Sequence, residues 1–130
     1  MNLATIALAV LFPAQAPAAP AKVVPMVVEV RTAPKAAAGV QAWAKELRAA
    51  LDTRKEEFRA AKPGETPEFV VRIDSVGRGQ GSTEVLNGAF ILGHATRPFT
   101  YSFADVRSEA EKLARNLRKY ADQMRAASAR

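Results

Sequence analysis

The residues that could carry chemistry are few in this sequence, and they are scattered. Glycines alternate with polar residues from Gly77 to Gly81, and Arg78 is the charged residue among them. A nucleotide-binding loop needs its glycines between a strand and a helix, so that helical N–H groups point at the phosphates. The segment that follows has the pattern of a strand and lacks a Gly-Lys-Ser/Thr sequence. We therefore interpret 77–82 as a hairpin loop in which Arg78 is a candidate anion contact.

Histidine and serine offer no better-defined centre. His94 is the single histidine, and cysteine is absent. A metal would have to be completed by Asp74, Glu84 and Asp105, which lack the spacing of a ligand set. The serines lie in strand-like or loop-like segments without the elbow that activates a nucleophile. We predict no catalytic residue, no metal ligand and no cofactor. Catalysis remains a third alternative, which a His94→Ala variant would test on any activity found.

The first eighteen residues predict export. An apolar run at 3–12 is followed by a proline and by small residues that offer two Ala-x-Ala cleavage sites, after Ala16 and after Ala18. This is the layout of a secretory signal peptide, and we prefer cleavage after Ala18 because the earlier cut leaves a proline at the scissile bond. An apolar tail on a cytosolic protein is the alternative, since no Lys or Arg precedes Lys22. We expect a periplasmic or secreted protein whose stability comes from its core, because no disulfide can form.

The chain is basic, with 19 Lys and Arg residues against 13 Asp and Glu residues and a net charge of +6. Outside the cytoplasm such a protein meets anionic lipids, cell-wall polymers and shed nucleic acid. Three cations of the last predicted helix, Arg115, Arg118 and Lys119, are candidate contacts. The aromatic residues that would stack on bases are missing, which argues against specific nucleic-acid recognition. The other interpretation is a solvated helix face that keeps a small domain soluble.

Hydrophobic periodicity predicts a single domain over 26–126, between an Ala/Pro-rich tether at 19–25 and a tail at 127–130. Runs of β-branched and aromatic residues predict four strands. The four strands are expected at 26–31, 68–76, 84–94 and 99–103. Arg97 and Pro98 are expected to turn the chain into the strand at 99–103.

Two apolar stripes at helical spacing predict two helices. The first runs from Val40 to Phe58 and includes Trp43, the single tryptophan, which we interpret as a core residue. Lys62-Pro63-Gly64 is expected to end it. The second stripe runs from Val106 to Met124 with either Asp105 or Ser108 as its cap, the latter through a Ser-x-x-Glu capping box. We interpret that stripe as a core-facing surface, with a helix–helix seam to a partner as the alternative.

The resulting order is β-α-β-β-β-α. Its simplest packing is an α+β two-layer sandwich, with two helices on one face of a small, mainly antiparallel sheet. The segment Ala89–Leu92 is apolar on both faces, which predicts a central strand. It also indicates that the second face of the sheet is covered, by a partner or by a second copy of the chain.

This arrangement resembles a group of small bacterial envelope domains. The residues that carry the resemblance are Phe69-Val-Val-Arg-Ile-Asp-Ser-Val76, the Gly-rich hairpin, Phe99-Thr-Tyr-Ser-Phe103 and the terminal helix with spaced leucines, most of 23–126. The group includes the N-terminal domain of the Tol system's propeller protein, curli-channel-type domains and lipoprotein activators of penicillin-binding proteins. The resemblance is one of architecture and assigns no functional residue. The chain differs in having no lipid-anchor cysteine and no propeller.

The resemblance implies a protein that acts by binding partners in the envelope and is not an enzyme. The sequence therefore predicts an exported, non-enzymatic domain that binds another cell-envelope protein. Binding of a basic surface to anionic cell-wall polymer or to a membrane surface is the alternative. The candidate contacts are Arg78, Arg115, Arg118 and Lys119, and the oligomeric state is left open.

Overall fold

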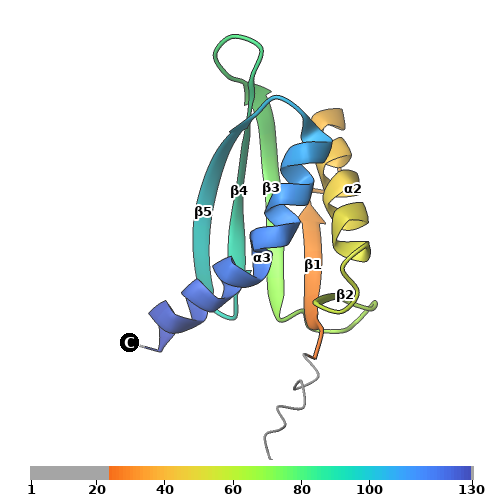
Figure 1. Ribbon diagram of the computed structural model, residues 1–130, viewed down its shortest axis with the longest axis vertical. Coiled ribbons are helices and arrows are strands. Elements are labelled where there is room, and N and C mark those ends of the chain that lie inside the picture. Colours follow the sequence, from red (N-terminus) through yellow and green to blue (C-terminus); the bar gives the residue numbers. More distant parts are fainter. Residues whose placement is uncertain (1–23, 130) are drawn as a thin grey trace, which may run out of the picture.

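The computed structural model describes residues 24–129, so the predicted signal peptide and most of the tether lie outside the described residues. The described chain forms a five-stranded sheet with strand order β2-β1-β3-β4-β5, and both helices cover one face of it (Figure 1). This confirms the predicted α+β sandwich, with a short strand β2 added to the predicted order. The elements are β1 (Met26–Thr32), α2 (Ala38–Asp52), β2 (Phe58–Ala60), β3 (Phe69–Arg78), β4 (Glu84–Leu92), β5 (Ala95–Phe103) and α3 (Val106–Ser128).

The sheet is mixed, which corrects the prediction of a mainly antiparallel one. β1 runs parallel to both of its neighbours, β2 and β3, whereas β3, β4 and β5 are antiparallel to one another. A strand that is followed by a helical crossover returns in the same direction, and α2 provides that crossover between β1 and β2. The antiparallel half follows from the two short hairpins that join β3 to β4 and β4 to β5.

The first helix ends ten residues before Lys62, where the sequence predicted its end. α2 stops at Asp52, and Thr53 Oγ1 donates a hydrogen bond to the carbonyl oxygen of Ala50 at 2.7 Å. Phe58 was predicted to continue the helical stripe, but it lies in β2, where it pairs with Met26 of β1. A threonine that bonds back to the helix competes with a further helical turn, and the open edge of β1 offers this segment backbone partners. Tertiary pairing therefore overrides the local helical pattern.

The β4–β5 hairpin turns at Gly93 and His94, so the prediction of a turn at Arg97 and Pro98 was wrong. Leu92 pairs with Ala95 on either side of a two-residue loop. Gly93 has a φ of +60°, the conformation that the first position of a type II′ turn requires. Pro98 lies within β5, which it can do because β5 is an edge strand where a missing N–H breaks no ladder bond.

The core lies between the sheet and the two helices. Trp43 is fully buried and meets Phe103 edge to face at a centroid distance of 5.3 Å, which confirms it as a core residue. The apolar stripe of α3, including Leu113 and Leu117, is buried in the same cluster. Asp105 is the cap of α3, because its carboxylate accepts a hydrogen bond from the backbone N–H of Ser108 at 2.9 Å; Ser108 itself lies inside the helix. α3 continues to Ser128, past the predicted domain boundary at 126.

Candidate functional site

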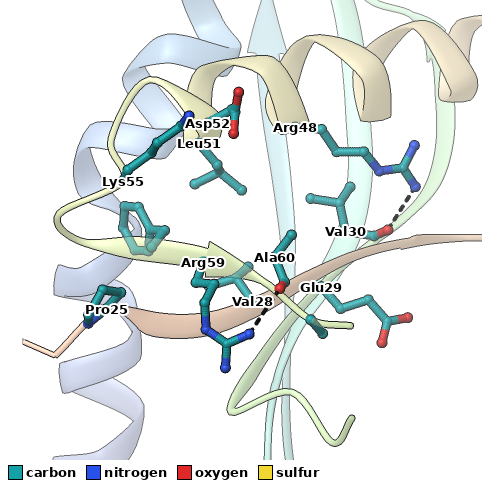
Figure 2. Close-up of a pocket in the computed structure, with 12 residues that line it drawn as sticks. Pro25, Val28, Glu29, Val30, Arg48, Leu51, Asp52, Lys55, Arg59 and Ala60 are labelled. Carbon is teal, nitrogen blue, oxygen red and sulfur yellow. Dashed lines mark hydrogen bonds between the residues drawn. The ribbon is translucent and has the colours of Figure 1, made fainter. Parts of the chain in front are cut away.

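A groove of about 610 Å³ lies along the sheet edge formed by β1 and β2, beside the C-terminal half of α2 (Figure 2). Its lining has an apolar floor and a charged rim. We call this surface the edge groove. The floor is formed by Val28, Val30, Leu51, Phe58 and Ala60, and the rim by Glu29, Arg48, Asp52, Lys55 and Arg59; Pro25 and Ala61 complete the lining.

The edge groove exists because β2 is short. β2 pairs with β1 only from Met26 to Val28, so the last four residues of β1 extend beyond it. Two hydrogen bonds show which residues of β1 direct their backbone N–H and C=O groups toward β2. Met26 N donates to Glu57 O at 2.8 Å, and Ala61 N donates to Val28 O at 3.1 Å. Backbone groups alternate in direction along a strand, so the N–H and C=O groups of Val30 and Thr32 point to the same side as those of Met26 and Val28. At this height β2 has already ended.

Arg48 occupies part of this open edge. It projects from α2, and its Nη2 donates a hydrogen bond to the carbonyl oxygen of Val30 at 2.9 Å, the bond drawn at the right of Figure 2. In a completed sheet a neighbouring strand would supply that donor. Charged side chains at sheet edges discourage uncontrolled pairing with other chains. Arg48 therefore bonds to the uncovered part of the edge through a side chain, where a neighbouring strand would use its backbone.

Two charged residues of the rim are engaged by neighbours. Glu29 accepts hydrogen bonds from Arg31 Nε at 2.8 Å and Nη2 at 3.2 Å, and this interaction lowers the pKa of Glu29. Arg59 donates two hydrogen bonds to Glu65, one of them at 3.0 Å. Together with the backbone N–H of residue 62, which donates to the same carboxylate, Arg59 lowers the pKa of Glu65 to about 2.

The other three rim residues, Arg48, Asp52 and Lys55, form no ion pair within 24–129. Two cations against one anion leave the rim with a net charge of +1. The volume of the edge groove falls in the range of roughly 300–1,000 Å³ that ligand-binding clefts occupy. Across residues 24–129 no three His, Asp or Glu side chains gather to hold a metal ion. What the edge groove can do chemically is accept an apolar side chain, a backbone and an acidic group.

The structure does not bring the predicted contact residues together. Arg78 ends β3 opposite Glu84, at the Gly-rich hairpin, whereas the other three belong to α3. Arg115 and Lys119 are exposed. Arg115 lines a smaller cavity of about 220 Å³ between the helices, together with Ala50, Thr53, Arg54 and Glu111.

Arg118, in contrast, is engaged in the structure of the domain itself. Its Nη2 donates to the carbonyl oxygen of Glu57 at 2.7 Å, and its guanidinium carbon lies 5.9 Å from the ring centroid of Phe58. Its Nε is buried and has no partner among the described residues. This arginine fastens the segment that leads into β2. His94 is exposed in the β4–β5 turn.

The second face of the sheet carries no helix within 24–129, but it is not an exposed apolar surface. Val70 is 5% exposed and Ala89 is 1% exposed. Ala89 lies in register between Arg72 of β3 and Pro98 of β5, so that a small side chain is screened by two larger ones. This explains how the centre of β4, flanked by two strands as predicted, is apolar on both sides although no helix of the described range lies over this face. The edge groove is therefore the stronger candidate site.

The residues of the edge groove were not singled out by sequence reasoning. Arg48, Asp52 and Lys55 all fall inside the single helix that the stripe from Val40 to Phe58 predicted, whereas α2 stops at Asp52 and leaves Lys55 outside it. The signal that could have located the site is Thr53, a residue that favours helix ends because its hydroxyl bonds to backbone carbonyls.

Neither α2 nor α3, the two helices of the described range, combines the length and apolar composition that a membrane-spanning helix needs. Comparison of the chain with protein-family models and with curated proteins found no match to either.

Proposed function

We propose that this chain is an exported, non-enzymatic domain that binds another protein of the cell envelope, and that it does so through the edge groove. Export is supported by residues 1–18, whose composition is that of a signal peptide. The observation that carries the binding site is a concave apolar floor beside a strand edge that β2 covers only in part. Apolar recesses with polar rims are where protein interfaces concentrate their binding energy.

The test is cross-linked affinity capture of the tagged full chain from the cell envelope, with washes at low and high salt. Ala60 lines the edge groove, and Ala49 lies on α2 outside it; both are exposed. Ala60→Arg fills the groove, whereas Ala49→Arg adds the same charge and bulk elsewhere. We expect one protein to be retained at high salt by the wild type and by Ala49→Arg, and to be lost with Ala60→Arg. Equal capture by all three, or no protein retained at high salt, would contradict the proposal.

The alternative function is electrostatic binding to anionic cell-wall polymer or to a membrane surface. It is favoured by Arg115 and Lys119, which are exposed on α3. Such binding weakens steeply as salt rises, because surface charges are screened and counterions compete. Under this alternative, replacing both residues by Glu removes sedimentation with the polymer or with anionic vesicles at low salt. Binding that is insensitive to salt would rule it out.

A further inference from the structure

The edge groove has the backbone of an incomplete sheet as well as a hydrophobic floor. Val30 and Thr32 point outward beyond the end of β2, and the acceptor of Val30 is satisfied by the side chain of Arg48. No strand among the described residues pairs with this part of β1 on its outer side. A row of outward backbone groups is a template for a further strand.

The shape of the edge groove favours an extended chain over a helix. Val28 and Val30, buried residues of β1, and Leu51, at the end of α2, form the floor beside this edge. An added strand would send alternate side chains over that floor while its backbone bonds to β1. A helix in the same place could not bond to the outward backbone groups of Val30 and Thr32, since its own backbone groups are already paired.

The charge of the rim indicates what the extended chain carries. Arg48 and Lys55 are cations without ion-pair partners in the described part of the chain, against one rim anion without such a partner, Asp52. The whole protein has a net charge of +6, which attracts an acidic partner. A backbone N–H from the partner can replace Arg48 on the carbonyl oxygen of Val30. The released guanidinium can then pair with a carboxylate of the partner.

We infer that the partner protein contributes an extended segment, which adds as a strand to the outer edge of β1 at Val30–Thr32. The face of this strand that is turned toward α2 carries apolar and acidic side chains at every second residue. The apolar side chains lie on the floor of the edge groove, and the carboxylates pair with Arg48 and Lys55. This inference rests on the proposed function, because it specifies how the same groove binds its partner.

The experiment uses the full mature chain and a synthetic ten-residue peptide labelled with fluorescein. In this peptide valine and glutamate follow each other at every second position, on one face of the extended chain, and threonine fills the positions between them. Fluorescence anisotropy measures its affinity, and amide hydrogen exchange by NMR locates the bound peptide. We expect exchange to slow at the amides of Val30 and Thr32. The opposite edge strand, β5, serves as an internal control, and the amides of Thr96 and Thr100 should not change. No binding, or protection on β5 instead, overturns the inference.

Two further peptides separate strand addition from side-chain binding. One has N-methyl groups on its valines and glutamates and the other on its threonines, so that each blocks one edge of the peptide backbone. In strand addition one edge faces the protein, and at least one methylated peptide should bind about tenfold more weakly. If all three peptides bind equally, strand addition is wrong while the proposed function stands. If the envelope capture fails, the proposed function and the strand addition are both wrong.

A matched pair of variants tests the role of charge. Arg48 and Lys45 both project from α2, but only Arg48 lines the edge groove. We expect Arg48→Glu to weaken binding of the valine–glutamate peptide about tenfold or more, and Lys45→Glu to leave it nearly unchanged. A peptide in which lysine replaces every glutamate should reverse this order and bind Arg48→Glu better than the wild type. Equal effects of the two variants would show that the peptide responds to net charge alone and would overturn the inference.

Discussion

Replacement of Gly88 by alanine is the substitution for which the structure predicts the sharpest loss of stability. Gly88 lies in β4 between Ile73 of β3 and Phe99 of β5, where the β3–β4 register shifts. A Cβ atom at position 88 would overlap the carbonyl oxygen of Arg72 and would lie 2.6 Å from Cζ of Phe99. The ring of Phe99 could rotate away at some cost. The carbonyl of Arg72 is backbone and can move only if the sheet moves with it.

The size of the loss follows from these two overlaps. Forcing an extra carbon into a packed site costs roughly 1–3 kcal/mol, and more where backbone must shift. We therefore expect Gly88→Ala to lower the free energy of unfolding by about 3 kcal/mol or more. For a domain of this size that corresponds to a fall in Tm of roughly 12–24 °C. It is a large part of the ~5–15 kcal/mol that a whole domain possesses.

Gly77 supplies the matched control. It lies near the end of β3, its φ is not positive, and no heavy atom lies within 4 Å of a Cβ built on it. Gly77→Ala should be neutral or stabilising by about 0.4–1 kcal/mol, because alanine restricts the unfolded chain. Urea and thermal unfolding, followed by circular dichroism, compare both variants with the wild type.

A double variant identifies the overlap that dominates. In Gly88→Ala/Phe99→Leu the ring is removed, but the carbonyl of Arg72 stays in place. We expect most of the additional loss caused by Gly88→Ala to persist against a Phe99→Leu background. The reasoning is refuted if Gly88→Ala unfolds within about 1 kcal/mol of Gly77→Ala, since two overlaps in a packed sheet cannot be that cheap.

Three further predictions concern polar contacts. Arg118→Met should lower the free energy of unfolding by about 1–3 kcal/mol because it removes a charged hydrogen bond, whereas Arg115→Met should leave the urea midpoint almost unchanged. Glu65 has a pKa of about 2 in the folded state against an ordinary value of 4.5, so its contribution is fully present above pH 4.5 and is lost as the pH falls toward 2; a series of urea midpoints against pH should show a smaller loss over this window in Glu65→Gln. Asp105→Ala should speed amide exchange in the first turn of α3 because the Ser108 amide loses its acceptor, and Asp105→Asn should restore most of the protection.

The spacing of apolar residues along the chain predicted the strands and helices that have one face buried in the core and the other exposed. The alternation of Phe69, Val71 and Ile73 marks β3, and these residues are buried under the helices. The spacing of Leu113 and Leu117 marks α3 in the same way. In each case the period of the apolar residues is a direct consequence of the side that faces the core. The same reasoning correctly predicted that Trp43 is a core residue, because a large aromatic side chain on the apolar stripe of a helix is buried together with that stripe.

The turn at Gly93 and the placement of Pro98 could not be predicted in this way. Proline is common in turns and equally acceptable on an edge strand, and its own sequence neighbourhood does not show which strand is an edge. That property belongs to the order β2-β1-β3-β4-β5, which depends on contacts between distant segments. The parallel pairing of β1 with β2 and β3 could not be predicted from the sequence for the same reason.

The error in the first helix has a physical consequence that bears on function. Leu51 and Phe58 are seven residues apart, a spacing that a helix and a helix–turn–strand both place on the core side. Had the helix continued to Lys62, residues 58–60 could not have paired with β1, and the edge groove would not exist in this form. The chain forms the three residues of β2 in place of further helical turns, and β2 ends before it reaches Val30 of β1. A continuous helix or a full-length β2 would have been simpler ways to finish this side of the sheet. An edge left half covered, with the side chain of Arg48 on the carbonyl oxygen of Val30, is the kind of local inconsistency that proteins retain where they bind something.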